Sequence, residues 1–294
     1  MIIIDFNQTL ISSLMANIGS NPNAEINENL VRHMVLSTLL MYKRKFSEEY
    51  GNIVIACDDK NYWRKDIYPH YKANRKKTRD KSSFDWKLIF ETLNKIRDEV
   101  KEFFPYIVIQ VPRAEADDII GSLVYRSQTK DLTTEGLFEE PEKIMIVSGD
   151  KDFVQLQKFE NVRQYSPMQK RFLSTDNADK FIKEHVMRGD SGDGVPNFLS
   201  DDDTFITEGK RQKSIMKKKL EVWLDQEPEE FCDTNMLRNY HRNAQLIDLS
   251  YIPEDISLQI EEQYEAGPQS GREKLFNYFI KKQLKHLMEC IKEF

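Results

Sequence analysis

The sequence has no apolar run that approaches the roughly 18 residues of a membrane-spanning helix, which excludes a helical membrane protein. It begins on a strand-like run and shows neither the basic region nor the cleavage site of a secretory leader. Its three cysteines (Cys57, Cys232 and Cys290) are an odd number without paired spacing, so we expect a reducing, cytoplasmic environment. The five histidines have no zinc-like spacing, which argues against a histidine-bound metal.

Charge of neither sign dominates, and the net charge of −6 by itself gives little reason to expect a nucleic-acid partner. The charges are, however, segregated. Residues 60–81 hold nine Lys or Arg and two acids, and residues 208–219 hold six Lys or Arg and one acid. Residues 220–265 hold twelve acids and two arginines. Because phosphate meets local patches and not the total charge, the two basic segments favour a nucleic-acid partner.

Three apolar runs of the sequence lead directly into an aspartate. They are residues 2–4 before Asp5, residues 53–57 before Asp58, and residues 144–149 before Asp150. Uninterrupted apolar runs of this length indicate strands buried on both faces, as in a parallel sheet covered by helices. Ligands of such sheets bind outside the carboxyl ends of the strands. Carboxylates gathered there repel one another unless a cation neutralises them, and oxygen ligands favour Mg²⁺ or Mn²⁺.

Helical and strand patterns alternate along the first two thirds of the chain. Helical periodicity covers residues 30–50, 86–104 and 113–126, a strand pattern covers 106–111, and a further helix is expected near 152–158. This alternation predicts a three-layer α/β domain with a parallel sheet. From about residue 180 the pattern is helical. We therefore predict an α/β domain over residues 1–186 and a smaller all-helical domain over 187–294.

Each acidic cluster also has a purely structural interpretation. Asp5 and Asp58 could cap a helix or start a turn, and the acids of Glu115–Asp118 would complement a helix dipole. Asp150 and Asp152 lie on a strand-to-helix turn, and the 189–196 segment is an acidic turn that contains three glycines. No single cluster decides between capping and metal binding. Five clusters on one parallel-sheet scaffold are hard to explain as caps alone.

The basic stretch of residues 60–84 alternates cations with aromatic side chains. Tyr62, Trp63, Tyr68 and Tyr71 lie among its Lys and Arg residues, and aliphatic residues are few, so we expect it to lie outside the core. A charge run is usually a solvated helix face. Aromatic rings beside cations suit base stacking next to phosphate contacts, which favours nucleic-acid binding.

At these positions the chain resembles the 5′-nuclease, or flap endonuclease, family, and most closely its ribonuclease H branch of T-even-type bacteriophages. The motifs that carry the resemblance are YKANR at 71–75, AEADDIIG at 114–121, SGDKDFVQL at 148–156 and GDSGDGVP at 189–196. All stand in the family's order, and the resemblance covers residues 1–198 well. It implies a PIN-like nuclease domain over 1–186 with a helical arch at about 60–84. It also implies a DNA-binding domain of helix-turn-helix type over 187–294.

The resemblance implies two Mg²⁺ ions, for which Mn²⁺ could substitute. The first would be bound by Asp5, Asp58, Glu115 and Asp117, with Asp118 nearby. The second would be bound by Asp150, Asp152 and Asp193, with Asp190 assisting through water. Lys72 and Arg75 on the arch would be the catalytic cations. The substrate contacts would be Tyr71, which could stack on the terminal nucleotide, and Arg64, Lys65, Lys76, Lys77, Lys210, Arg211 and Lys213.

The chain also departs from the family pattern. Gly194 stands where many relatives have asparagine, which leaves the hydrogen bonding of that turn open. The glycine-rich hairpin that usually follows is replaced by Asp201-Asp202-Asp203 and a basic segment, which puts a potassium site in doubt.

The implied function is Mg²⁺-dependent hydrolysis of phosphodiesters from the 5′ end of duplex DNA and RNA–DNA hybrids. Such an enzyme would remove RNA primers and 5′ flaps in DNA replication, as in Okazaki fragment processing. We expect a monomer without a membrane partner, in the host cytoplasm if the protein is encoded by a phage. A single-strand-binding protein or a sliding clamp is a plausible partner, although no docking motif is evident. The amphipathic segment Leu275–Phe294 is expected to be core, because its apolar residues recur at helical spacing.

Three alternatives remain open. A phosphatase of the haloacid dehalogenase type would use Asp5 as nucleophile, but it requires a second acid at position 7, where Asn7 stands. A compact single-strand ribonuclease would not need the long helical C-terminal region. A non-catalytic, structure-selective DNA-binding protein would use the acids for folding only, and it would leave bound flap substrates uncut in the presence of Mg²⁺.

Overall fold

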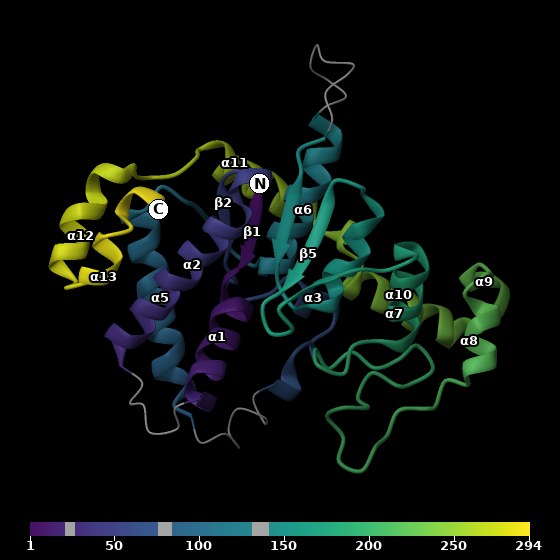
Figure 1. Ribbon diagram of the computed structural model, residues 1–294. Helices are drawn as coiled ribbons and strands as arrows, with labels where there is room; N and C mark the ends of the chain where they lie inside the picture. The colour runs from purple at the N-terminus through teal and green to yellow at the C-terminus, as the bar shows by residue number, and fades with distance from the viewer. Residues whose placement is uncertain (21–26, 76–83, 131–140) are drawn as a thin grey trace.

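The computed structural model describes residues 1–20, 27–75, 84–130 and 141–294 (Figure 1). Its centre is a six-stranded sheet in the order β3-β2-β1-β4-β5-β6. The first five strands in this order are parallel, and β6 is antiparallel to β5. The strands are β1 (Ile2–Asp5), β2 (Ile53–Ala56), β3 (Ile107–Ile109), β4 (Ile144–Val147), β5 (Val162–Ser166) and β6 (Arg171–Leu173).

The strand residues face two separate apolar layers, because successive side chains point to opposite faces of a sheet. Ile2 and Ile4 of β1 belong to the core cluster on one face, and Ile3 belongs to the cluster on the other. The first face is covered by α1 (Phe6–Ser20), α2 (Glu28–Tyr50) and α5 (Trp86–Phe103). The second is covered by α6 (Ala116–Lys130), the 3₁₀ helix η1 (Lys151–Lys158) and α11 (Glu254–Glu265). The predicted three-layer α/β fold with a mostly parallel sheet is confirmed.

The part of the chain after β6 is helical, as predicted. Its elements are α7 (Ala178–Arg188), α8 (Lys217–Trp223), α9 (Pro228–Phe231), α10 (Thr234–Ile247), η2 (Leu249–Tyr251), α11, η3 (Arg272–Lys274), α12 (Leu275–Lys281), α13 (Lys285–Met288) and η4 (Ile291–Glu293). Figure 1 shows α8 and α9 at one side of the molecule and α12 and α13 at the other.

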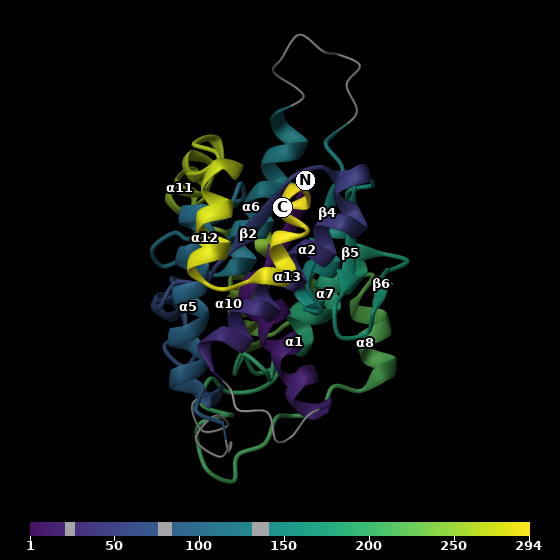
Figure 2. The same ribbon diagram turned by 60° about the vertical axis from the view of Figure 1, so that its left-hand side comes forward.

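These C-terminal helices do not share one core. Phe198 and Leu220 belong to a small separate cluster, whereas Leu275, Phe279 and Phe294 are fully buried in the main cluster with α2 and α5. Figure 2 brings α12 and α13 to the front of the molecule, next to α2 and α5. The core role predicted for residues 275–294 is confirmed for one face of the segment, whereas Phe276 and Ile280 are 53% and 52% exposed. The domain boundary at 186/187 stays a prediction. Helices that come after it, such as α11 and α12, bury their apolar side chains in the two core layers of the α/β part.

The first half of the basic stretch corrects one expectation. It contains the short helix α3 (Arg64–Ile67), and three of its aromatic side chains, Trp63, Tyr68 and Tyr71, are at most 4% exposed. Trp63 packs in the second core layer, and the two tyrosines pack with α7 and α10. The expectation that this stretch lies outside the core is wrong here, because the rings anchor it while Lys60 and Lys65 stay at the surface. Lys76 and Lys77 lie outside the described residues.

A buried ion network joins the C-terminal helices to the α/β layers. The Arg32 guanidinium donates to both carboxylate oxygens of Glu99, at 2.7 and 2.9 Å. Tyr278 of α12 donates its hydroxyl to the same carboxylate at 2.8 Å, and Lys282 also donates to it. Burial alone would raise the pKa of Glu99, but the hydrogen bonds from Arg32, Lys282 and Tyr278 outweigh it and lower the pKa to about 2.

Glu99→Gln should lower the free energy of unfolding by about 2 to 4 kcal/mol at pH 7, because it removes one partner of a buried ion pair. The lowered pKa means that this contribution is present above the unfolded pKa and is lost as the pH falls toward 2. Urea unfolding at pH 7 and pH 3 measures both effects. Glu293→Gln is the matched control, since its pair with Arg44 is about half exposed and should contribute much less to stability. Equal losses in the two variants would contradict the prediction.

Candidate active site and metal centre

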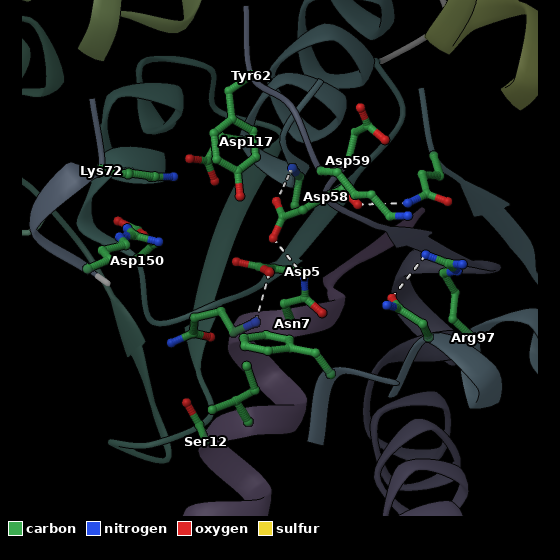
Figure 3. Close-up of a pocket in the computed structure, with 18 of the residues that line it drawn as sticks. Asp5, Asn7, Ser12, Asp58, Asp59, Tyr62, Lys72, Arg97, Asp117 and Asp150 are labelled. Carbon is green, nitrogen blue, oxygen red and sulfur yellow. Dashed lines mark hydrogen bonds between the residues drawn. The ribbon is translucent and has the colours of Figure 1, made fainter. Parts of the chain in front are cut away.

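A cavity of about 1030 Å³ opens outside the carboxyl ends of β1, β2 and β4 (Figure 3). Besides Asp59, four carboxylates line it, and each of the four comes from the end or beginning of a different element. Asp5 ends β1, Asp58 follows β2, Asp150 follows β4, and Asp117 lies in the first turn of α6. The position is the one at which open parallel sheets bind ligands. The structure therefore brings together four of the predicted metal ligands.

Two of these acids also act as local anchors. Asp5 accepts the Gln8 N–H at 3.1 Å through Oδ1 and the Ser148 hydroxyl at 3.0 Å through Oδ2. Asp58 accepts the Ala116 N–H at 2.8 Å and the Asn7 side-chain amide at 2.7 Å, which ties β2 to the start of α6. Asp5 and Asp58 thus anchor the local backbone and line the cavity at the same time. The hydrogen bonds hold the carboxylates in place at the cavity wall.

The electrostatics of the cavity fit a cation. Burial, followed by repulsion from Asp58, raises the pKa of Asp5 to about 7. Burial, followed by repulsion from Asp152, raises the pKa of Asp150 to about 6. Burial and then Asp150 raise the pKa of Asp117 well above its usual range. Within the described ranges, none of the four cavity carboxylates forms an ion pair with a Lys, Arg or His, so a hard divalent ion would complete this oxygen set.

Glu115 and Asp118, the other two predicted acids of this segment, point into the protein and not into the cavity. Arg64 binds both through NH1, at 3.0 Å from Glu115 and 3.1 Å from Asp118, and its NH2 lies 2.8 Å from Asp118. Asp118 also accepts the Glu115 N–H and the Trp63 indole N–H. Arg64 is only 2% exposed, so the expectation that it contacts substrate is wrong in this structure. Its charge is used to neutralise two buried acids.

Asp193 is held by the segment that carries the predicted catalytic cations. Arg75 and Lys72 both pair with its carboxylate, Lys72 at 3.5 Å, and Tyr71 donates its hydroxyl to it at 2.9 Å. Lys72 also pairs with Glu115. Burial would raise the pKa of Asp193, but Lys72 and Arg75 outweigh it and hold the pKa below its usual range. Tyr71 is 2% exposed, so the ring expected to stack on a nucleotide is buried, whereas Tyr62 lines the cavity.

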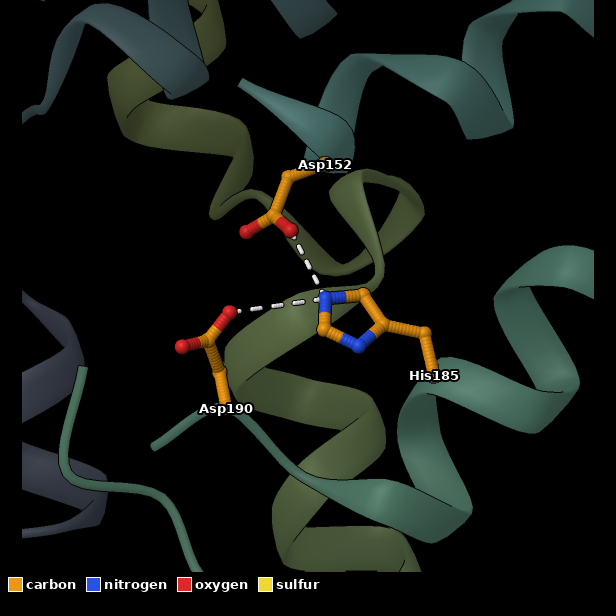
Figure 4. A group of neighbouring side chains, drawn as sticks. All are labelled: Asp152, His185 and Asp190. Atoms are coloured by element: carbon orange, nitrogen blue, oxygen red, sulfur yellow. Dashed lines mark hydrogen bonds and ion pairs between the residues drawn. The ribbon is translucent and has the colours of Figure 1, made fainter. Parts of the chain in front are cut away.

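A third group of side chains was not expected from the histidine spacing. His185 in the last turn of α7 places Nε2 2.7 Å from Asp152 Oδ1 and 3.6 Å from Asp190 Oδ2 (Figure 4). The three residues offer ligand atoms within 4.8 Å of one another. A histidine four residues before the GDSGDG turn is the one sequence signal that could have indicated it.

Asp190 mainly organises its own turn. Its Oδ1 accepts the N–H groups of Gly192 and Asp193 at 2.7 and 3.1 Å, and Lys151 pairs with Oδ2 at 2.9 Å. Gly194, at φ +73°, closes the turn through its N–H to Ser191 and accepts the Tyr68 hydroxyl at 3.2 Å. The turn is thus closed without an asparagine side chain at position 194.

The other cations predicted to contact substrate differ in their exposure and in their ion pairs. Lys65 is exposed at the cavity margin, and Arg211 and Lys213 are exposed on the segment before α8. Lys210 is paired with Asp201 at 2.8 Å and with Asp203. Asp202 accepts from Arg238 and Arg242. The run of three aspartates is therefore neutralised by cations of the chain itself.

Two family models match the chain and together cover it from end to end. The model described as 5′-3′ exonuclease, N-terminal resolvase-like domain, matches residues 1–187. The model described as T4 RNase H, C terminal, matches residues 176–294. The chain belongs to the 5′-3′ exonuclease family. The predicted family and its nuclease activity class are confirmed, and the phosphatase alternative is set aside.

Individual relatives agree with this assignment. The ribonuclease H of Enterobacteria phage T4 is 35% identical over 302 residues, which cover 99% of this chain and 95% of that protein. A 5′-3′ exonuclease of Buchnera aphidicola is 28% identical over 52% of this chain and 50% of its own. The relatives of this exonuclease-family chain are thus hydrolases that act on nucleic acids.

Solved structures support the fold of this 5′-3′ exonuclease. The T5 D15 protein co-crystallised with metal ions has a TM-score of 0.60 at 18% identity, over 90% of this chain and 98% of that one. The bacteriophage T5 D15 flap endonuclease in complex with DNA and metal ions has a TM-score of 0.58 at 17% identity, over 90% and 97%. Across the described residues, no helix is long and apolar enough to cross a membrane.

Without metal, the cavity carboxylates should make folding less favourable as the pH rises. Because the folded-state pKa values of Asp5 and Asp150 are raised to about 7 and about 6, stability is greatest below the unfolded pKa of 3.8 and is lost as the pH rises through these values. In EDTA at pH 8, Asp5→Asn should therefore raise the free energy of unfolding by about 1 to 2 kcal/mol. Chemical denaturation at pH 5 and pH 8 measures this gain.

The exposed Asp66→Asn is the control, and we expect it to change the free energy of unfolding by less than about 0.5 kcal/mol at either pH. If Asp5→Asn destabilised the metal-free protein equally at pH 5 and pH 8, the Asp5 carboxylate would act only as a cap.

Proposed function

We propose that the protein is a divalent-metal-dependent 5′→3′ exonuclease and flap endonuclease. The observation that carries the proposal is the set of four carboxylates without internal cations, Asp5, Asp58, Asp117 and Asp150, on the wall of a cavity that Lys72 and Arg75 also line. Acidic oxygens that lack a counter-charge suit Mg²⁺ or Mn²⁺, and cations beside them suit a phosphate. The cavity thus offers carboxylates for the metal ion and cations for the phosphate, the two participants in a metal-assisted phosphodiester hydrolysis.

Two shells of ligands are proposed. Asp5, Asp58 and Asp117 would hold one ion, and Asp150, Asp152 and Asp193 would hold another, with Asp190 acting through water. Glu115, which is paired with Arg64 and Lys72, would border the first set without facing the cavity. Bound ions of this kind polarise a phosphodiester and lower the pKa of a bound water. Asp118 is better explained as a structural partner of Arg64, because all its contacts point inward.

The chain's own cations would act on the substrate. Lys72 and Arg75 now neutralise Glu115 and Asp193, and a phosphate in the cavity would compete for them. Bound to the scissile phosphate, they would stabilise the charge that develops on its oxygens in the transition state. Tyr62 offers a partly exposed ring next to Lys72, at 5.3 Å, for a terminal base.

Substrate geometry is proposed from these groups and from the relatives. A single-stranded 5′ end would enter the cavity, and Lys65, Lys210, Arg211 and Lys213 would contact the phosphates of the adjoining duplex. The relatives named ribonuclease H and flap endonuclease support RNA–DNA hybrids and 5′ flaps as substrates. We place the protein in primer and flap removal during DNA replication, in the host cytoplasm, with a single-strand-binding protein or sliding clamp as candidate partners.

Asp150→Asn should lower the cleavage rate of a 5′-labelled flap by at least about 100-fold, because it removes one carboxylate of the metal set. The same protein should remain folded and keep its affinity for the flap, as measured by fluorescence anisotropy in Ca²⁺. Asp66→Asn, an exposed acid outside the cavity, should cleave at the wild-type rate. A folded Asp150→Asn protein that cleaves at the wild-type rate would refute the metal assignment. Wild-type protein that binds flaps but leaves them uncut in Mg²⁺ or Mn²⁺ would support a non-catalytic binding protein.

Lys72→Ala should lower the single-turnover rate by about 100-fold, with a change in flap affinity of less than about threefold, since its main contact is expected in the transition state. Lys65→Ala is the matched control on the same segment. It should weaken binding and reduce the salt dependence of the affinity, with little change in the bound-state rate. The reverse pattern, a loss of affinity without loss of rate for Lys72→Ala, would make Lys72 a simple phosphate contact.

A further inference from the structure

His185 contacts two acids of the proposed metal centre, although it lies on a different element from either. It is in the last turn of α7, is 6% exposed, and packs its ring against Phe181 at 5.9 Å between ring centres. Asp152 lies in the first turn of η1, and Asp190 follows the C-cap of α7. The helix α7 is packed against η1, so the imidazole bridges the two segments that carry these acids.

The direction of the short hydrogen bond follows from the chemistry of the two groups. An ionised carboxylate can only accept hydrogen bonds, so the 2.7 Å contact requires a proton on His185 Nε2. This bond occupies Oδ1 of Asp152. Among the described residues, no hydrogen bond or ion pair falls on Oδ2, and Figure 4 shows that oxygen turned away from the imidazole.

Asp152 is also linked to the cavity group through its main chain and its charge. Its N–H donates to Oδ1 of Asp150 at 3.0 Å, and its charge is the largest electrostatic contribution after burial to the raised pKa of Asp150. In Asp190, in contrast, Oδ1 accepts hydrogen bonds within its own turn and Oδ2 pairs with Lys151. Of the two acids beside His185, Asp152 is therefore the one with an oxygen left for a ligand.

We propose that His185 is a positioning residue of the metal centre: it fixes Asp152 through Oδ1 and thereby presents Oδ2 to a divalent cation. The inference rests on the proposed function, since it requires a metal at this edge of the sheet. Carboxylate ligands that are oriented by a second hydrogen bond bind metal more tightly, because the rotamer is already selected. The same contact lets α7, and through its C-cap the 189–194 turn, set the geometry of a ligand on η1.

The test measures Mn²⁺ binding to the metal-free protein in the absence of DNA, by electron paramagnetic resonance of free Mn²⁺ and by calorimetry. His185→Leu should weaken one class of Mn²⁺ site by about 10-fold, the range seen when groups that orient a ligand are removed. His185→Gln retains an N–H near the position of Nε2 and should stay within about threefold of wild type. Asp152→Asn should weaken the same class of site, and adding His185→Leu to it should have no further effect, since the histidine acts through Asp152.

Gln155→Leu separates positioning from packing. The buried Gln155 side chain donates to the main-chain oxygens of Asp152 and Ile247 and does not touch the Asp152 carboxylate. This variant should lower the unfolding temperature in EDTA and leave Mn²⁺ affinity unchanged. Equal losses of Mn²⁺ affinity in Gln155→Leu and His185→Leu, or an additive effect of His185→Leu in the Asp152→Asn protein, would overturn the inference. Wild-type protein that binds no Mn²⁺ would instead overturn the metal-dependent function, and the inference with it.

Discussion

Repulsion among carboxylates at one edge of a parallel sheet is the constraint on which the rest of this structure depends. Asp5, Asp58 and Asp150 meet there because their strands run parallel, and Asp117 joins them from the first turn of α6. Like charges this close are unfavourable, and burial makes them more so, which raises the pKa values of Asp5 and Asp150. A fold that keeps such a cluster must either neutralise it internally or reserve it for an external cation.

Both solutions occur in this chain, and they divide its acids by role. Arg64 neutralises Glu115 and Asp118 inside the protein, and Lys72 and Arg75 neutralise Asp193 at the cavity margin. Lys210 and two arginines of α10 neutralise the aspartates of the 201–203 turn. The four cavity carboxylates have no such partner in the described part of the chain. This difference, more than the number of acids, separates the cavity carboxylates from the acids that have a counter-charge within the protein.

Several features of the fold were predictable because they depend on local pattern. The uninterrupted apolar runs indicated strands buried on both faces, and the runs that end in Asp5, Asp58 and Asp150 are three neighbouring parallel strands. Helical spacing in Leu275–Phe294 indicated core packing, which Phe279 and Phe294 confirm. The family motifs gave the order of the acidic clusters along the chain. Composition misled in residues 60–75, since a stretch rich in cations was expected outside the core, yet Trp63, Tyr68 and Tyr71 are buried.

The sequence by itself determined which residue types reach the carboxyl edge of the sheet, because the apolar runs mark where the strands end and the alternation of strand and helix patterns makes the strands parallel. Only the tertiary structure decided which charges meet. Arg64 and Asp118 are 54 residues apart, and His185 and Asp152 are 33 apart, so no spacing rule along the chain could pair them. Ion pairs and hydrogen bonds act over a few ångströms, and such distances between remote segments are set by the packing of α3 and α7 onto the sheet layers. For that reason Arg64 proved to be a buried counter-charge and His185 a neighbour of two candidate metal ligands.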